Sequence, residues 1–286
     1  MVKTILQEFR VHHWTKNILI FFPVIISETQ ITSNVVINCL LCFISFSLIA
    51  SAIYMLNDII DYNRDLLHPF KKNRPYAAGK IKKLTLIYNI IIFVIIGIFI
   101  SLSLSYEYFF IIIVYISLNI IYFFFLKKII FIDTLTLVLF YILRVEAGLI
   151  VNDISFSYWL ISFLFFLFLS LSFFKKYIDV KVSKNSDNEL YSKKHEKYLI
   201  FSGITTGILS SLLIYIFAEN DLLSITYGNV LYFKLITPVL IIWIILLWRD
   251  GIKNKVSTDL ISYILKRKSN YFILLIVGFL YFLSLA

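Results

Sequence analysis

The chain has 286 residues, of which 60% are hydrophobic, 18% aromatic and 15% charged, and its mean hydropathy is +0.88. Charged residues make up about 25% of a typical soluble domain, so this composition excludes that class and indicates a polytopic membrane protein. A formal net charge of +10 could suggest nucleic-acid binding, but the distribution of the charge along the chain argues against it.

Apolar runs of about 20 residues, the length that crosses a bilayer as a helix, follow one another along the chain. Nine of them lie near residues 12–30, 33–56, 84–105, 107–126, 129–150, 156–174, 198–218, 230–248 and 270–286. The first is the weakest, because its purely apolar part is short and contains Pro23. We predict an all-α integral membrane fold: about nine transmembrane helices in one bundle, forming a single domain over residues 1–286, with an active-site cavity that faces the cytoplasm.

Basic residues alternate with these runs. Apart from Arg144 and Lys234, every Lys and Arg falls in one of five segments: residues 1–16, 57–83, 127–128, 175–197 and 249–268. The alternate connections carry mainly acidic residues, which is the positive-inside pattern. It predicts a multi-pass protein of the cytoplasmic (inner) membrane whose N-terminus and basic loops are cytoplasmic.

Three carboxylates at helical spacing follow the second run. Asp58, Asp61 and Asp65 stand at i, i+3 and i+7, so a helix would bring them to one face. Like charges on one face repel unless a cation lies between them, and Mg²⁺ takes carboxylates together with substrate phosphates. The spacing therefore predicts a Mg²⁺ site. The alternative, a solvated helix end, is less favourable because acidic residues oppose the dipole at a helix C-terminus.

A basic cluster follows these acids within the same connection. Lys71, Lys72 and Arg74 can form charge-assisted hydrogen bonds to phosphates. Ordinary positive-inside topology would also place basic residues here, but their position beside three acids favours phosphate binding. The stretch as a whole predicts a Mg²⁺–diphosphate site at the membrane surface.

More ionisable residues stand at the ends of later runs. Lys127 precedes the fifth run, Asp133 lies one turn inside it, and Lys175, Lys176 and Asp179 close the sixth. A single bundle would bring these run ends together around one cytoplasmic cavity.

Two basic residues, Arg144 and Lys16, lie outside these clusters. Arg144 lies inside the fifth run, where a charge is costly and usually faces the bundle interior. An ion pair with Glu146 and phosphate binding are even alternatives for it. Lys16, near Trp14, is read as part of an interfacial anchor, although it could point into the cavity.

The run Asn57-Asp58-x-x-Asp61-x-x-x-Asp65 resembles the first aspartate-rich motif of the UbiA-type superfamily of membrane prenyltransferases, which are nine-helix bundles that bind an isoprenoid and a diphosphate with Mg²⁺. A finer resemblance is to the decaprenyl-phosphate phosphoribosyltransferase branch. Four blocks carry it: residues 13–17, 51–79, 126–148 and 175–179. The chain departs from the branch at Val11, where Pro is usual, and at Asp179, which replaces a Glu.

The resemblance implies transfer of 5-phosphoribose from phosphoribosyl diphosphate to a polyprenyl phosphate, with release of diphosphate, in cell-envelope biosynthesis. It implies Mg²⁺ held by the three aspartates with help from Asn57, and phosphates held by Lys71, Lys72 and Arg74. Candidates for the ribose 5-phosphate or the lipid phosphate are Lys127, Arg144, Lys175 and Lys176. Asp179 would bind ribose hydroxyls or a second metal.

Two alternatives remain open. An aromatic prenyltransferase of quinone or haem biosynthesis would share the fold and the Mg²⁺ site. Its second aspartate-rich motif is not evident here, where Lys175, Lys176 and Asp179 stand instead, and the extra cations favour a donor with more phosphates. A lipid transporter is the alternative from another class, but no Gly/Pro-broken helix pair or inverted repeat is apparent.

Overall fold

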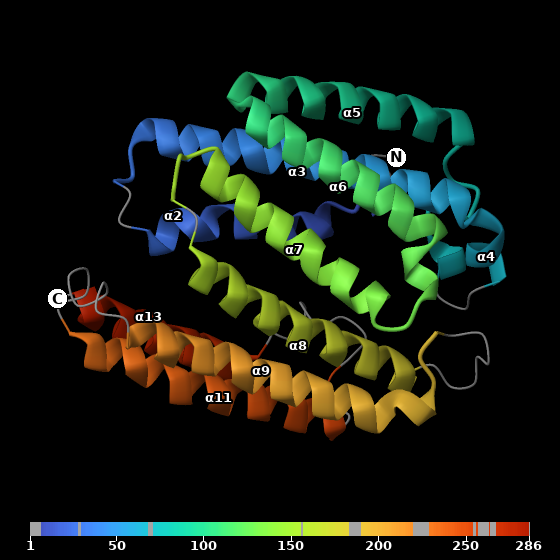
Figure 1. Ribbon diagram of the computed structural model, residues 1–286. Helices are drawn as coiled ribbons and strands as arrows, with labels where there is room; N and C mark the ends of the chain where they lie inside the picture. The colour runs from blue at the N-terminus through green and yellow to red at the C-terminus, as the bar shows by residue number, and fades with distance from the viewer. Residues whose placement is uncertain are drawn as a thin grey trace. The chain divides into compact units, whose positions relative to one another are not determined.

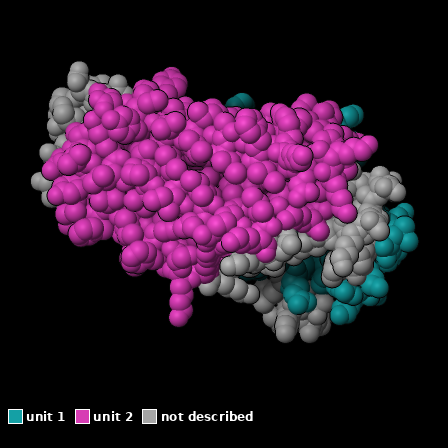
Figure 2. Space-filling view, turned by 90° about the horizontal axis from the view of Figure 1, so that it is seen from below, with its two compact units in different colours: residues 1–127, 140–156 teal, residues 128–139, 157–286 magenta. Residues whose placement is uncertain are grey.

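The computed structural model describes residues 7–27, 30–67, 71–155, 157–182, 190–219, 229–253, 256, 263 and 267–285. Every regular element within these ranges is a helix, which confirms the all-α prediction (Figure 1). The contacts divide the chain into two compact units, coloured separately in Figure 2: residues 1–127 with 140–156, and residues 128–139 with 157–286. That residues 1–286 form one domain stays a prediction.

The first unit is built from α-helices and three 3₁₀ helices, one of which begins it. In chain order its elements are η1 (Val11–Phe21), α2 (Phe22–Ile26), α3 (Ser33–Ile60), α4 (Tyr62–Leu67), η2 (Lys71–Asn73), α5 (Lys83–Leu104), α6 (Tyr106–Phe124) and η3 (Leu126–Lys128). Helix α7 (Ile132–Ile150) starts in the second unit and ends in the first. The second unit continues with α8 (Tyr158–Val182), η4 (Lys193–His195), α9 (Glu196–Ala218), α11 (Val230–Ile252) and α13 (Lys268–Leu285).

Among the described residues, seven helices are long and apolar enough to cross a membrane, so the chain is a multi-span membrane protein. They are α3, α5, α6, α8, α9, α11 and α13. Helix α7 is not among them, because its 19 residues include Asp133, Arg144 and Glu146. The predicted count of nine is therefore not confirmed.

The first predicted span, residues 12–30, is not one α-helix. Its main part is η1, a 3₁₀ helix of 11 residues, and 3₁₀ helices have three residues per turn. Trp14, Asn17 and Ile20 recur at this period and share one face. Trp14 Nε1 donates to Ser51 Oγ at 2.9 Å and Asn17 Nδ2 to Ser47 Oγ at 2.8 Å, while Ile20 is fully buried. The polar side chains on this face of η1 are thus hydrogen-bonded to α3.

Helix α7 also approaches η1 very closely. A Cβ added at Gly148 would lie 2.0 Å from the backbone oxygen of Ile20. One turn earlier in α7, Arg144 Nε donates to Asn17 Oδ1 at 2.7 Å. Gly148 is therefore required by packing between two backbones, and η1 is held between α3 and α7.

We predict that Gly148→Ala destabilises the protein by about 1–3 kcal/mol, because the new methyl group overlaps a backbone atom that cannot rotate away. Thermal unfolding of the detergent-purified protein measures the change. Gly278→Ala is the matched control, since a Cβ there meets nothing within 4 Å. Equal melting temperatures for the two variants would contradict the prediction.

Candidate functional site

The three aspartates of the predicted metal site do not lie on one continuous helix. Helix α3 ends at Ile60, Asp61 caps it with φ −88° and ψ 11°, and α4 begins at Tyr62. Asp58 and Asp65 are buried, at 3% and 2% exposure, whereas Asp61 is half-buried. Within the described part of the chain, no three His, Cys, Asp or Glu side chains are grouped closely enough to hold one metal ion.

Basic side chains neutralise all three carboxylates. Arg74 Nη1 lies 2.9 Å from Asp58 Oδ1 and 2.5 Å from Asp65 Oδ2, and so bridges the two buried acids. Arg10 Nη2 also binds Asp58 Oδ1. Lys127 Nζ lies 3.2 Å from Asp61 Oδ1. Arg10, Arg74, Asp58 and Asp65 thus form one network, and the intervening Asp61 pairs with the predicted residue Lys127.

The network fits a hard divalent cation by the chemistry of its donors. Carboxylate oxygens of Asp58 and Asp65 both contact one positively charged nitrogen, Nη1 of Arg74. A cation in the position of this nitrogen would therefore have two oxygen ligands. Mg²⁺ is bound in proteins by one or two carboxylates together with substrate phosphates. Asp58 and Asp65 are therefore the residues that could hold Mg²⁺, whereas Asp61 is paired with Lys127.

Arg10 is a site residue that sequence reasoning missed, because its segment was read as an interfacial anchor. It has φ 51°, which is uncommon for a residue other than glycine, and it precedes the first residue of η1. Its guanidinium lies over the Tyr54 ring, 5.0 Å from the centroid. Hydrogen bonds from η1 to Ser47 and Ser51 of α3 accompany the contact between Arg10 and Asp58, and the apolar pattern of this short segment does not indicate them.

Glu8 is a second missed residue. It is 1% exposed, and its Oε2 accepts a hydrogen bond of 3.2 Å from the Tyr76 backbone N–H. Its Oε1 has no hydrogen-bond partner among the described residues. Burial raises the pKa of Glu8 to about 7, and the negative charge of Asp58 adds to the increase.

The remaining predicted residues of this region differ in their exposure to solvent. Lys71 and Lys72 are exposed on η2, while Asn57 on α3 and Lys16 on η1 are half-buried. Residues 68–70, part of the motif block, lie outside the described residues. The basic cluster therefore places Arg74 inside the network and leaves two lysines at the surface.

A separate polar cluster occupies the second unit. Lys176 Nζ forms an ion pair with Asp133, which is 3% exposed. Tyr191 was not predicted: its hydroxyl accepts the Phe131 N–H at 2.9 Å and bonds Thr134 Oγ1 at 2.8 Å. Burial raises the pKa of the Tyr191 hydroxyl, so it stays protonated at neutral pH.

The two predicted neighbours of Lys176 are less enclosed. Lys175 is exposed on α8, and Asp179 is half-buried one turn later. Phe131, which precedes α7, has φ 67°, and Tyr191 holds this strained turn. Asp133, the second residue of α7, follows this turn directly and forms the ion pair with Lys176.

Arg144 is not paired with Glu146 in the structure. Its guanidinium, 3% exposed, donates to Asn17 Oδ1, to the Phe140 carbonyl and to Tyr115 Oη at 3.3 Å. It also lies over the Phe46 ring, 4.9 Å from the centroid. The ion-pair interpretation was wrong, because residues two apart on a helix face different directions.

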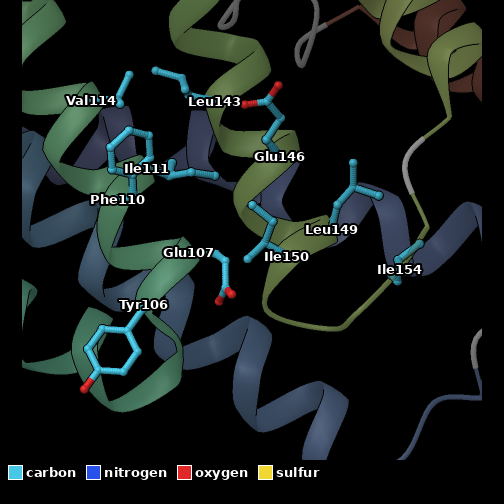
Figure 3. A pocket seen from close by; sticks show the side chains of 10 residues that line it. All are labelled: Tyr106, Glu107, Phe110, Ile111, Val114, Leu143, Glu146, Leu149, Ile150 and Ile154. Carbon is cyan, nitrogen blue, oxygen red and sulfur yellow. The ribbon is translucent and has the colours of Figure 1, made fainter.

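Glu146 instead lines a hollow of about 730 Å³ in the first unit (Figure 3). The walls come from the start of α6 and the end of α7, and the lining is mainly apolar: Phe110, Ile111, Leu143 and Ile150. A second carboxylate, Glu107, also lines it. Such walls suit a hydrocarbon chain, whereas two carboxylates repel a phosphate. None of the predicted site residues is in this lining.

Known proteins resemble this chain over most of its length. The UbiA prenyltransferase family model matches residues 19–270. The uncharacterized protein y4nM of Sinorhizobium fredii (strain NBRC 101917 / NGR234) is 26% identical over 278 residues, which cover 95% of this chain and 54% of that protein. The chain therefore spans about half the length of this curated relative.

Two further likenesses bear on the branch and the fold. The decaprenyl-phosphate phosphoribosyltransferase of Mycobacterium tuberculosis (strain CDC 1551 / Oshkosh) is 32% identical over 87 residues, 28% of each chain. The solved structure of a UbiA homolog from Archaeoglobus fulgidus bound to GPP and Mg²⁺ has a TM-score of 0.70 and 16% identity, and the match covers 98% of both chains. At this identity the structural likeness shows the fold alone.

We predict a pH-dependent contribution of Glu8 to stability. Its folded pKa of about 7 lies above the ordinary 4.5, so the folded state binds the proton more tightly. This contribution is complete below pH 4.5 and is lost as the pH rises through about 7. Melting curves of wild type and Glu8→Gln between pH 5 and 8 should diverge, with the wild type losing more stability. If the stabilities of the two proteins changed in parallel with pH, the raised pKa of Glu8 would be contradicted.

We also predict that Tyr191→Phe destabilises the protein by about 1–3 kcal/mol, because it leaves the Phe131 N–H and the Thr134 hydroxyl without their partner. Thermal unfolding in detergent checks this. Tyr198→Phe is the control, since Tyr198 is 52% exposed and packs on the same Phe131 ring. The prediction fails if both variants melt together.

Proposed function

The chain belongs to the UbiA prenyltransferase family, and we propose that it is a Mg²⁺-dependent polyprenyl-phosphate phosphoribosyltransferase. It transfers 5-phosphoribose from phosphoribosyl diphosphate to a polyprenyl phosphate of the decaprenyl-phosphate type and releases diphosphate. The observation that carries the proposal is the network in which Arg10 and Arg74 meet two buried aspartates, because it combines ligands for a cation with donors for phosphates.

The choice of donor rests on the sequence after the sixth apolar run. Lys175, Lys176 and Asp179 stand where an aromatic prenyltransferase has its second aspartate-rich motif, and more cations suit a substrate with more phosphates. The partial match to the mycobacterial phosphoribosyltransferase supports the same choice. The distribution of basic residues among the loops supports a site on the cytoplasmic side of the inner membrane, where positive charge is retained.

Charge neutralisation and positioning carry the reaction. Bound Mg²⁺ supplies positive charge to the leaving diphosphate. Arg10, Arg74 and Lys127 release their aspartates and donate to the phosphate oxygens. The bond from ribose C1 to the diphosphate breaks, a bond from C1 to an acceptor phosphate oxygen forms, and the transition state has oxocarbenium character. The acceptor phosphate is already ionised, so no general base is required.

The other predicted residues serve the substrates' outer groups. Lys71 and Lys72, exposed beside Arg74, attract the incoming donor. Lys175 and Lys176 bind the 5-phosphate or the lipid phosphate, and Asp179 accepts ribose hydroxyls. Asn57 and Lys16 assist at the diphosphate. For Arg144 the contacts with Asn17 and Tyr115 support a different role, which is to hold η1 in place.

An aromatic prenyltransferase is the second candidate, because it would share the fold and the Mg²⁺ site; the Archaeoglobus fulgidus homolog of this fold was solved with GPP and Mg²⁺. A prenyl diphosphate donor would use the same aspartates and arginines. The two candidates differ in the group that is transferred, so an assay of two donors separates them.

We predict that detergent-purified protein with Mg²⁺ moves label from phosphoribosyl diphosphate into polyprenyl phosphate. EDTA should abolish the transfer, and Asp58→Asn should reduce it at least about 100-fold, because charge stabilisation of the leaving group is lost. Asp153→Asn, an exposed acid in the same unit, should keep wild-type activity.

A parallel reaction contains a prenyl diphosphate and 4-hydroxybenzoate. Product in this reaction alone would replace the proposed donor and leave the metal site in place. Full transfer in the presence of EDTA would instead remove Mg²⁺ from the mechanism.

A further inference from the structure

Glu8 is a buried carboxylate that the mechanism above does not use. A carboxylate oxygen that is buried without a hydrogen bond is costly, and Oε1 of Glu8 has no such bond to any described residue. Asp58, Arg10 and Arg74 all act electrostatically on this carboxyl group, so it borders the network of the diphosphate site. Stability alone does not explain an acid in this place.

The partner of Glu8 belongs to a tight turn that follows Arg74. Within this turn the Gly79 N–H donates to Tyr76 O at 3.0 Å and the Lys80 N–H to Pro75 O at 2.9 Å. Gly79 has φ 71°, a conformation that favours glycine. The turn is therefore held by its own hydrogen bonds, and the bond from its Tyr76 N–H to Glu8 fixes it as a unit.

Glu8 itself stands on backbone that is anchored to α3. Ser51 Oγ donates to the Phe9 carbonyl at 2.8 Å, and Trp14 Nε1 donates to the same hydroxyl at 2.9 Å. The bond between Glu8 and Tyr76 thus joins the N-terminal segment to the turn, two segments that are far apart in sequence.

The two residues joined by this bond lie equally far in sequence from the two arginines of the site. Arg10 stands two residues after Glu8, and Arg74 stands two residues before Tyr76. Both guanidiniums reach the same oxygen, Oδ1 of Asp58. The Glu8–Tyr76 bond and the two ion pairs therefore close one ring of contacts, in which Glu8 sets the spacing between the arginines.

We infer that Glu8 is a positioning residue of the diphosphate site: its hydrogen bond to the Tyr76 amide holds Arg10 and Arg74 at the spacing at which both donate to one diphosphate. The inference rests on the proposed function. Glu8 acts through the two arginines and does not touch the substrate.

Binding of inorganic diphosphate with Mg²⁺ to the full-length protein, measured by calorimetry in detergent, tests the inference. Glu8→Ala should bind about tenfold more weakly, the effect of losing one hydrogen bond. Glu8→Gln keeps an oxygen that accepts from the Tyr76 N–H and should bind within about threefold of wild type. Glu8→Asp keeps the charge but shortens the reach, and should resemble Glu8→Ala.

Hydrogen exchange of residues 74–80 gives a second readout that does not depend on a ligand. Exchange at Tyr76 should become faster in Glu8→Ala and Glu8→Asp and stay slow in Glu8→Gln. Glu219→Ala, which removes an exposed acid in the second unit, is the control and should change neither binding nor exchange.

The outcomes separate this inference from the proposed function. Wild-type protein that does not bind Mg²⁺–diphosphate would refute the proposed function and, with it, the role of Glu8 at that site. Wild-type binding with equal affinity in Glu8→Ala and Glu8→Asp would overturn the inference alone. Unchanged exchange at Tyr76 in these variants would also overturn it, and if Glu8→Ala does not fold, Glu8→Asp decides.

Discussion

The ion pairs at Asp58 are the interaction on which the first unit depends. A buried carboxylate is tolerated only when it is paired. Asp58 is paired with two guanidiniums, that of Arg10, which precedes it in the sequence, and that of Arg74, which follows it. Arg10 ties the segment before η1 to the end of α3, and Arg74 ties the turn after η2 to the same point. The site and the packing of these segments therefore have a common cause.

The same pairing explains how a surface rich in positive charge can hold acids in a buried place. In the structure, Asp58, Asp61 and Asp65 are each matched by a basic side chain from another segment. Under the proposed function, a ligand with its own cation and its own phosphates would exchange partners with these pairs, so that no charge would be left unpaired. In the structure the balance of charge at the site comes from the protein's own side chains.

Much of this arrangement could be predicted from sequence. Composition and apolar runs predict the all-helical membrane fold, and the spacing of acids and bases places Arg74 and Lys127 near the aspartates. Other features depend on contacts between distant segments. The break at Asp61 interrupts the expected helix face, and Glu8 gains its place only through the Tyr76 amide.

The segment around η1 escaped prediction for a different reason. A period of three residues is indistinguishable from the helical pattern in a short apolar stretch, so its polar face toward Ser47 and Ser51 was read as an anchor. The roles predicted for Arg144, an ion pair or phosphate binding, followed from its charge. In the structure its guanidinium instead donates to Asn17 and Tyr115, which lie far from it in the sequence.

The long 3₁₀ helix has a consequence for the lengths that the N-terminal segment can take. A 3₁₀ helix rises about 2.0 Å per residue, so the 11 residues of η1 extend about 22 Å, a span that an α-helix needs about 15 residues to cover. Each residue also turns the chain by a third of a circle. If one residue were inserted or deleted between Arg10 and Ile20, the side chains on the N-terminal side of the change would turn by a third of a circle. They would then no longer face α3. A substitution in this segment changes only the contacts of one side chain, whereas a change in its length displaces many of them together.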